Sequence, residues 1–295
     1  MGGEPVSSVL YDAPGPRARI RNRLISGVAA LAILGLLAYV AQRFEATGQF
    51  ESIKWRQFTL PSIQRELFAG LRATLKAAAI ATVLALLFGA VFAAARLSDH
   101  RILRWPGAVV VELFRAIPLL ILIFFWYYVP LQYGSPLSTL WALVLGLTLY
   151  NGSVLAEIFR AGILAVAKGQ SEAAYAVGMR KGQVTRLILL PQAVRTMLPT
   201  IISQLVVLLK DTALGFIITY PELLSIGKQI GGRLTYGFPF LPTYLVIAAI
   251  YIGINGLLSI TATWLERRTR RSHKTTAAPP PPAQKVAIES GSTGL

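Results

Sequence analysis

Long apolar runs, separated by short polar and basic segments, dominate the sequence. Six of these runs approach or exceed the ~20 residues that a helix needs to cross a bilayer. The pattern therefore predicts an all-α membrane protein with about six transmembrane helices, near residues 24–42, 69–95, 107–130, 138–160, 195–217 and 239–264. In the second run, alanine or glycine recurs every four positions from Ala77 to Ala93, which predicts close packing against another helix.

Charge is scarce and lies mainly in the segments between the runs. Charged residues make up 14% of the chain, whereas a soluble domain usually has about 25%. With a cytoplasmic N-terminus, most lysines and arginines fall on the cytoplasmic side, so both termini are predicted to be cytoplasmic. The formal net charge of +16 follows from this placement, and no nucleic-acid-binding motif accompanies it.

The two ends of the chain are predicted to differ from its body. Residues 1–23 form a basic cytoplasmic segment ahead of the first run, 24–42. This run is longer than the core of a signal peptide and more runs follow it, so it is predicted to remain as an extra first helix. Residues 268–295 contain Pro279 to Pro282 and many small polar residues, which predicts a disordered cytoplasmic tail.

The sequence gives no reason to expect a catalytic residue, metal or cofactor in this chain. It contains no cysteine, and its two histidines, His100 and His273, are far apart in polar segments, whereas a metal site needs clustered ligands. It also lacks the Gly-x-x-x-x-Gly-Lys-Ser/Thr loop that cradles the phosphates of ATP.

Several charged residues fall inside the apolar runs. Each costs about 2.5–3.5 kcal/mol there unless it finds a partner or water. Glu112 and Arg115 are three residues apart, as are Glu157 and Arg160. Both spacings predict an ion pair within one helix.

Lys210 and Asp211 need another explanation. Adjacent residues in a helix point about 100° apart, so these two side chains do not face each other. Gln204 falls on nearly the same face as Asp211, and Asn151 is a polar residue within the fourth run. One interpretation is the wall of a polar pathway; the other is a buried ion pair with another helix.

The long basic loop between the fourth and fifth runs has the features of a short helix followed by a turn. Ser171 is placed to cap the helix, with Glu172 in its first turn. Gly178 allows a left-handed backbone, and a second amphipathic stretch then ends near Pro191. Such an element can dock on a partner protein, or it can be a solvated basic loop.

The spacing in this loop resembles the signature of permease subunits of bacterial ATP-binding-cassette (ABC) importers. That signature reads Glu-Ala-Ala, three residues, Gly, nine residues, then Ile-x-Leu-Pro. The resemblance implies that coupling helices near 170–190 seat in a separate ATPase and carry its motion to the membrane helices. The matching residues are Glu172, Ala173, Ala174, Gly178, Ile188 and Pro191.

Further stretches resemble the polar amino-acid permeases of histidine, glutamine and glutamate importers. The likeness extends over about 67–267, and the extra first helix is similar to that of actinobacterial glutamate permeases. Ala116, Ile117 and Ala167 depart from residues that many members have at these positions. The similar stretches are Phe114–Leu120, Tyr150–Gly162, 168–170, Leu190–Arg195 and Leu208–Thr212.

This resemblance implies a type I (MetI-like) importer permease fold in a bacterial plasma membrane, with a polar amino acid as substrate and glutamate as the first candidate. It implies an ATPase dimer that holds ATP and Mg²⁺, a second permease subunit, an extracellular binding protein and surrounding lipid, and no nucleic acid. The alternatives are an ion-coupled secondary carrier, whose typical repeated halves are not visible, and a membrane scaffold. The predicted substrate pathway contains Asn151, Glu157, Gln204, Lys210 and Asp211.

Overall fold

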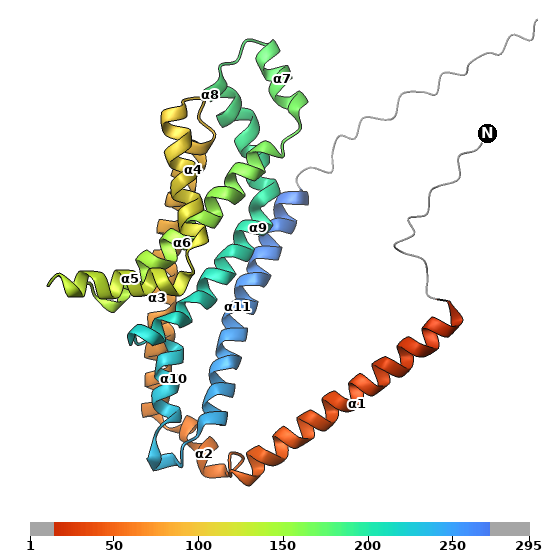
Figure 1. Ribbon diagram of the computed structural model, residues 1–295, viewed down its shortest axis with the longest axis vertical. Helices are drawn as coiled ribbons and strands as arrows, with labels where there is room; N and C mark the ends of the chain where they lie inside the picture. Colours follow the sequence, from red (N-terminus) through yellow and green to blue (C-terminus); the bar gives the residue numbers. More distant parts are fainter. Residues whose placement is uncertain (1–14, 272–295) are drawn as a thin grey trace, which may run out of the picture. The chain divides into compact units, whose positions relative to one another are not determined.

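The computed structural model describes residues 15–271 (Figure 1). Helices and their connecting loops make up this range, with no strand among the described residues, in agreement with the all-α prediction. The described residues form two units. One contains 15–73 and 221–250, and the other contains 74–220 and 251–271.

The first unit begins with α1 (Pro16–Ala46), in which no residue is buried. This helix extends the predicted 24–42 at both ends and includes part of the predicted basic segment 1–23, of which 1–14 lies outside the described residues. An ion pair between Arg233 and Glu66, with nitrogen and oxygen 2.6 Å apart, helps to hold the unit together. Its other elements are α2 (Ser52–Arg56), η2 (Gln57–Thr59), the start of α3 (Pro61–Arg96), α10 (Leu223–Gly231), η5 (Leu234–Tyr236) and the start of α11 (Phe240–Arg271).

The second unit is built around α6 (Thr139–Leu164), whose apolar stretch is the most buried among the long helices of the described residues. Packed with it are α4 (Arg101–Ala116), α5 (Leu119–Gln132), α9 (Leu190–Asp211) and η4 (Thr212–Ile218). The connection from α6 to α9 consists of α7 (Lys168–Ala176), α8 (Lys181–Gln183) and η3 (Val184–Leu189), which is a π-helical turn. The later parts of α3 and α11 complete the unit.

The small residues of α3 pack closely, as their spacing predicts. Ala81 and Ala85 are fully buried. A Cβ added to Gly89 would lie only 2.9 Å from the Cβ of Leu155 in α6, so a larger side chain does not fit there. The predicted packing of the second run is therefore confirmed, and it brings the C-terminal part of α3 against α6.

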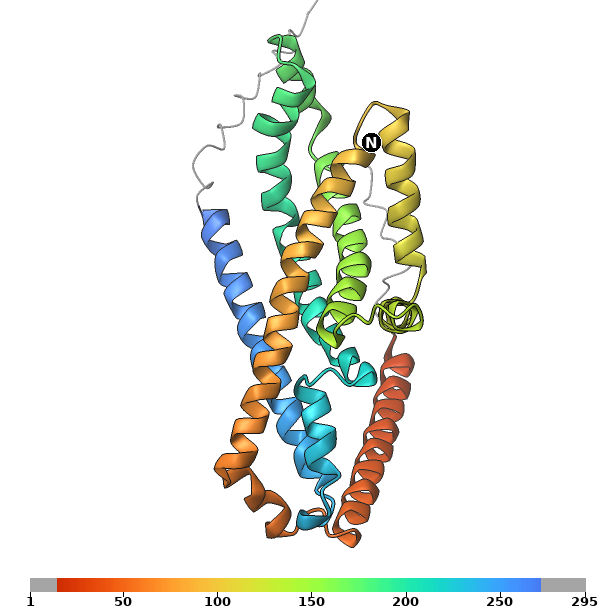
Figure 2. The same cartoon turned by 90° about the vertical axis from the view of Figure 1, so that its left-hand side faces the viewer.

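The third apolar run, 107–130, is not one helix. The chain bends by 97° between α4 and α5 (Figures 1 and 2). Pro118 has no N–H to donate and disfavours helical backbone in the residue before it, and Ile117 is extended, with φ −82° and ψ 127°. The prediction of a continuous third helix was wrong. In the described residues, 5 helices are long and apolar enough to span a membrane, or up to 6 with the bent pair as one span.

The fifth run begins earlier than predicted. Helical backbone starts at Lys181 and continues into α9, so the amphipathic stretch does not end near Pro191. Pro191 lacks the donor for an ordinary helical hydrogen bond. It is the second residue after the π-helical turn, in which bonds reach five residues back. At the end of the chain, α11 runs to Arg271, into the predicted tail 268–295, and residues 272–295 lie outside the described range.

Candidate functional site

A helical hairpin connects α6 to α9: its first arm is α7, its second arm is α8 with η3, and Gly178 forms the turn between them. This residue has a φ of +82°, which confirms the predicted left-handed backbone. The N–H of Met179 donates to the carbonyl of Ala174 (3.2 Å), and the N–H of Gly178 donates to that of Tyr175 (2.9 Å). These two bonds are the Schellman pattern that ends a helix at a left-handed residue. The glycine therefore ends α7 and reverses the chain toward α8.

The start of α7 differs from the prediction. The N-cap residue is Ala167, not Ser171, and no side chain caps the helix. The backbone of Ala167 is extended (φ −54°, ψ 129°), so the helix begins at Lys168. Ser171 lies inside the helix, where its hydroxyl donates to the carbonyl of Lys168 (2.7 Å), a bond that serine can make to the preceding turn. Glu172 is consequently in the middle of α7 and gains little from the helix dipole.

One face of the hairpin is packed and the other is exposed. Ala174 is buried against η3, where Val184 is buried as well. The side-chain amide of Gln192 in α9 donates to that of Gln170 in α7, over 3.3 Å. The remaining signature residues are more accessible: Glu172, Ala173, Gly178 and Pro191 are exposed and Ile188 is half-buried.

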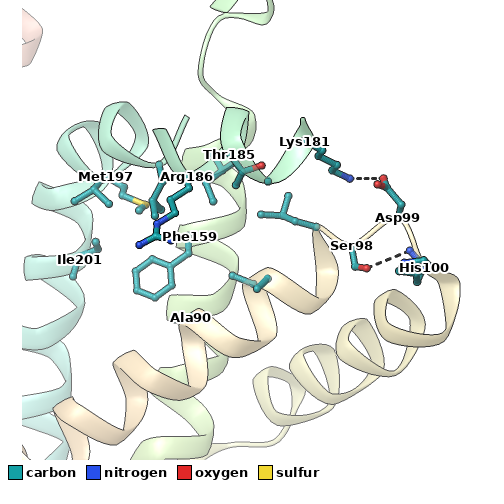
Figure 3. A pocket seen from close by; sticks show the side chains of 17 residues that line it. Ala90, Ser98, Asp99, His100, Phe159, Lys181, Thr185, Arg186, Met197 and Ile201 are labelled. Carbon is teal, nitrogen blue, oxygen red and sulfur yellow. Dashed lines mark hydrogen bonds and ion pairs between the residues drawn. The ribbon is translucent and has the colours of Figure 1, made fainter. Parts of the chain in front are cut away.

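A cavity of about 790 Å³ lies beside the second arm of the hairpin, between α3, α6 and α9 (Figure 3). Its lining is mainly apolar and includes Phe159. At its rim, Lys181 forms an ion pair with Asp99 in the loop between α3 and α4. The hydrogen bond and charge of the lysine hold the pKa of the Asp99 carboxyl below its usual value. His100 borders the same cavity, whereas His273 lies outside the described residues.

Five charged side chains form a network where α3, α4 and α6 meet. Arg160 Nε donates to Glu157 over 3.1 Å, and Arg115 Nη1 lies 3.6 Å from the Glu112 carboxylate. Both predicted ion pairs are therefore confirmed. Arg96 joins them, with nitrogens 3.0 Å from Glu157 and 3.2 Å from Glu112. Sequence reasoning missed Arg96 because its partners come from other helices, and no local spacing indicates such contacts.

A second polar group lies within the membrane helices. Gln204 Nε2 donates to Oδ1 of Asn151 (2.7 Å), and Nδ2 of Asn151 donates to the Asp211 carboxylate (3.5 Å). We call these three residues the polar chain. It confirms that Gln204 and Asp211 share a face. Of the other residues predicted for the pathway, Glu157 belongs to the charged network and Lys210 is exposed. In the described range Asp211 forms no ion pair with another helix.

The membrane helices and the exposed hairpin are those of the membrane subunit of an importer. A family model for the binding-protein-dependent transport system inner membrane component matches residues 85–271. The chain therefore belongs to this family of multi-pass inner-membrane proteins. Its members are non-catalytic permease subunits, as predicted, and not ion-coupled secondary carriers.

Individual relatives narrow the assignment to polar amino-acid permeases of ABC importers. The glutamate transport system permease protein GluD of Corynebacterium glutamicum is 45% identical over 227 residues, which cover 76% of this chain and 82% of GluD. The glutamate/aspartate import permease protein GltK of Escherichia coli is 34% identical over 211 residues, which cover 69% of this chain and 93% of GltK. The predicted family is thus confirmed.

Solved structures share the fold. The crystal structure of an amino acid ABC transporter with histidines matches with a TM-score of 0.67 and 28% identity, over 72% of this chain and 97% of that chain. The inward-facing MetNI methionine ABC transporter matches with a TM-score of 0.59 and 20% identity, over 71% of this chain and 98% of that chain. The predicted MetI-like type I importer fold is therefore confirmed.

Proposed function

We propose that this chain imports glutamate or a closely related polar amino acid as one of two permease subunits, powered by an ATPase dimer on its cytoplasmic side. The names of GluD and GltK support glutamate as the first candidate. An extracellular binding protein would deliver the amino acid to the opposite side. ATP and Mg²⁺ would bind the ATPase dimer, where hydrolysis supplies the energy.

The hairpin is the observation that carries this proposal. Its exposed surface presents Tyr175 beside Glu172, and Val177 beside Ala173 at the end of α7; Tyr175 and Val177 are 48% and 77% exposed. An aromatic and an aliphatic side chain exposed at the end of a short helix suit a hydrophobic groove on a partner protein. We assign this face to the ATPase.

The buried face of the hairpin would transmit the motion. Ala174 is small enough for α7 to lie directly on η3, and Gly178 sets where the tip of the hairpin points. Ile188 and Pro191 follow, where the second arm becomes α9. A displacement of the bound hairpin would therefore reach a membrane helix without an intervening flexible loop.

The polar chain is the proposed wall of the substrate path. Directly after Asp211, α9 gives way to the 3₁₀ helix η4, and Thr219 then has a left-handed φ of 59°. Irregular backbone at membrane depth occurs where it is buried in protein or lines a cavity, and a 3₁₀ stretch often marks a hinge. Asp211 would bind the ammonium group of the substrate, and Lys210 its carboxylate.

Reconstitution in liposomes with the ATPase and the binding protein tests the proposal. Glutamate uptake should require ATP and survive ionophores. It should fall about tenfold or more in Asp211→Asn and Lys210→Met, because a hydrogen bond to a charged group is worth about 1.5–3 kcal/mol. Lys76→Met is the matched control, since Lys76 is an exposed lysine of α3. Unchanged uptake in both pathway variants would remove these residues from the path, and uptake driven by an ion gradient would refute the function itself.

The orientation can be tested separately because the chain contains no cysteine. Thr47 follows α1, and His100 lies in the loop that Lys181 of the hairpin contacts through Asp99; both are exposed. A membrane-impermeant maleimide should label Thr47→Cys in intact cells and His100→Cys only after permeabilisation. The reverse pattern would place the hairpin outside, where no ATPase can reach it.

A further inference from the structure

The charged residues of α4 lie in one stripe along the helix. At about 100° per residue, Arg101, Arg104, Glu112 and Arg115 fall within an arc of about 80°. The C-terminal half of the stripe, Glu112 and Arg115, belongs to the charged network around Arg96. The N-terminal half differs, because neither Arg101 nor Arg104 forms an ion pair with any residue of 15–271.

The two unpaired arginines line a pocket of about 580 Å³ with two arginines of the network. No carboxylate is among the lining residues, and the charged network with the two added arginines holds five arginines against two glutamates. Like charges this close repel one another unless an anion joins them. The pocket is lined by Arg96, Arg101, Arg104, Trp105, Ala108 and Arg160.

Arg96 gives the pocket a rigid wall. Its side chain is only 13% exposed and is held by Glu112 and Glu157. Its Nη1 lies 3.0 Å from the Glu157 carboxylate as an ion pair, yet this buried nitrogen makes no hydrogen bond within the described part of the chain. The two carboxylates therefore hold its guanidinium in the wall of the pocket, where its charge adds to that of the neighbouring arginines.

We propose that this pocket binds the phosphate of an anionic glycerophospholipid in the cytoplasmic leaflet. Guanidinium groups bind phosphate oxygens through paired hydrogen bonds, and basic pockets between membrane helices are a known type of headgroup site. The inference rests on the proposed cytoplasmic position of the hairpin. The Lys181–Asp99 ion pair places the loop before α4 on the side of the hairpin.

The surroundings of the pocket favour a lipid over a soluble anion. Trp105 and Ile102 beside it are 72% and 85% exposed. Tryptophan is enriched where a membrane helix meets the headgroup region, and an exposed isoleucine next to arginines offers a contact to an acyl chain. A glycerophospholipid can place an acyl chain against these apolar side chains, a contact that inorganic phosphate cannot make. The pocket also adjoins the end of α3, a helix long and apolar enough to span a membrane.

Native mass spectrometry of the purified full-length chain in detergent tests the assignment. Phosphatidylglycerol is titrated against the wild type, the pocket variant Arg101→Gln/Arg104→Gln and the control variant Arg56→Gln/Arg65→Gln. The control removes the same charge from the opposite, proposed extracellular side of the membrane, where both arginines are exposed. Phosphatidylcholine and inorganic phosphate serve as comparison probes.

We expect the pocket variant to bind phosphatidylglycerol about 30-fold more weakly than the wild type, which corresponds to about 2 kcal/mol for two arginines near the membrane surface. The control variant should bind phosphatidylglycerol like the wild type. The pocket variant and the control variant should both unfold at the wild-type temperature, because neither substitution removes a residue of the charged network. Equal phosphatidylglycerol binding by the pocket variant, or equal retention of phosphatidylcholine by the wild type, would overturn the proposal.

Displacement of the lipid by millimolar inorganic phosphate would also overturn it and assign the pocket to a soluble anion. Loss of ATPase co-purification in the pocket variant, with lipid binding unchanged, would assign these arginines to the ATPase instead. The lipid titration needs neither ATP nor transport. A negative result therefore removes the lipid site and leaves the proposed import function to its own test.

Discussion

Replacing Gly178 tests the turn of the hairpin directly. The residue has a φ of +82°, and a Cβ added to it would meet no atom within 4 Å. Alanine therefore causes no clash, and its cost is the left-handed backbone, about 1–2 kcal/mol for an L-residue. That energy lowers the population of the native turn, relative to other turn conformations, by about five- to thirtyfold.

The effect should appear in coupling and not in the stability of the membrane helices. Glutamate imported per ATP hydrolysed in liposomes should fall several-fold in Gly178→Ala. It should fall further in Gly178→Val, because a branched side chain is least compatible with a positive φ. Gly178→Asn should retain most of the coupling, since asparagine tolerates this backbone. The unfolding temperature in detergent should stay close to that of the wild type in all three variants.

Gly169→Ala is the matched control in the same helix. A Cβ on Gly169 also meets nothing within 4 Å, and its φ is not in the left-handed region. Alanine is favoured over glycine within a helix by about 0.5–1 kcal/mol, so coupling should equal or exceed that of the wild type. The reasoning is refuted if Gly178→Val couples as well as the wild type, or if Gly169→Ala loses as much as Gly178→Ala.

Three further predictions concern the second unit. Glu157→Gln should lower the free energy of unfolding by about 1–3 kcal/mol, because it removes a charged partner from the mostly buried Arg96. Glu112→Gln should lower it by about 1 kcal/mol or less, because the Glu112 side chain is 59% exposed. Gly89→Val should destabilise the α3–α6 contact by about 1–3 kcal/mol, whereas Gly253→Val, with open space around its Cβ, should be nearly neutral. Thermal unfolding in detergent checks both pairs, and equal effects within a pair would contradict them. Lys181 lowers the pKa of the Asp99 carboxyl below its usual value of 3.8. The stabilisation that the Lys181–Asp99 ion pair gives to the folded protein is therefore fully present above pH 3.8, and it is lost only as the pH falls through the lowered pKa. Asp99→Asn should therefore leave the shape of the uptake profile unchanged between about pH 5.5 and 8, and a shifted profile would contradict this.

Prolines account for the main differences between the predicted and the observed helices. Pro118 lies inside an apolar run long enough for one span, and yet the chain bends sharply there. Pro191 has the opposite outcome: it has the appearance of a helix end, but the helix continues through it. The outcome depends on whether neighbouring backbone can satisfy the carbonyl that a proline leaves free. Nothing in the local sequence states which neighbours will be present.

The same distinction applies to the site. The turn at Gly178 and the pairing of Glu157 with Arg160 depend on nearby residues, and the sequence predicted both. The contact between Gln204 and Asn151, and the partners of Arg96, depend on how separate helices approach each other. The small residues of α3 indicated a packed face but could not identify the helix that packs on it.

Helix continuity connects the hairpin to the polar chain. The helical segment that begins at Lys181 includes all of α9, whose 22 residues alone extend about 33 Å. At the start of this segment, Lys181 forms an ion pair with Asp99. At its other end, α9 finishes at Asp211, which accepts a hydrogen bond from Asn151 in α6. A packed helix moves by shifting or rotating as a body, so a pull on the hairpin should act on the bonds between α9 and α6. The bond from Asn151 to Asp211, at 3.5 Å, is longer and weaker than the 2.7 Å bond from Gln204. On the proposed mechanism it would open first, and the Asp211 carboxylate would then be free to bind the substrate.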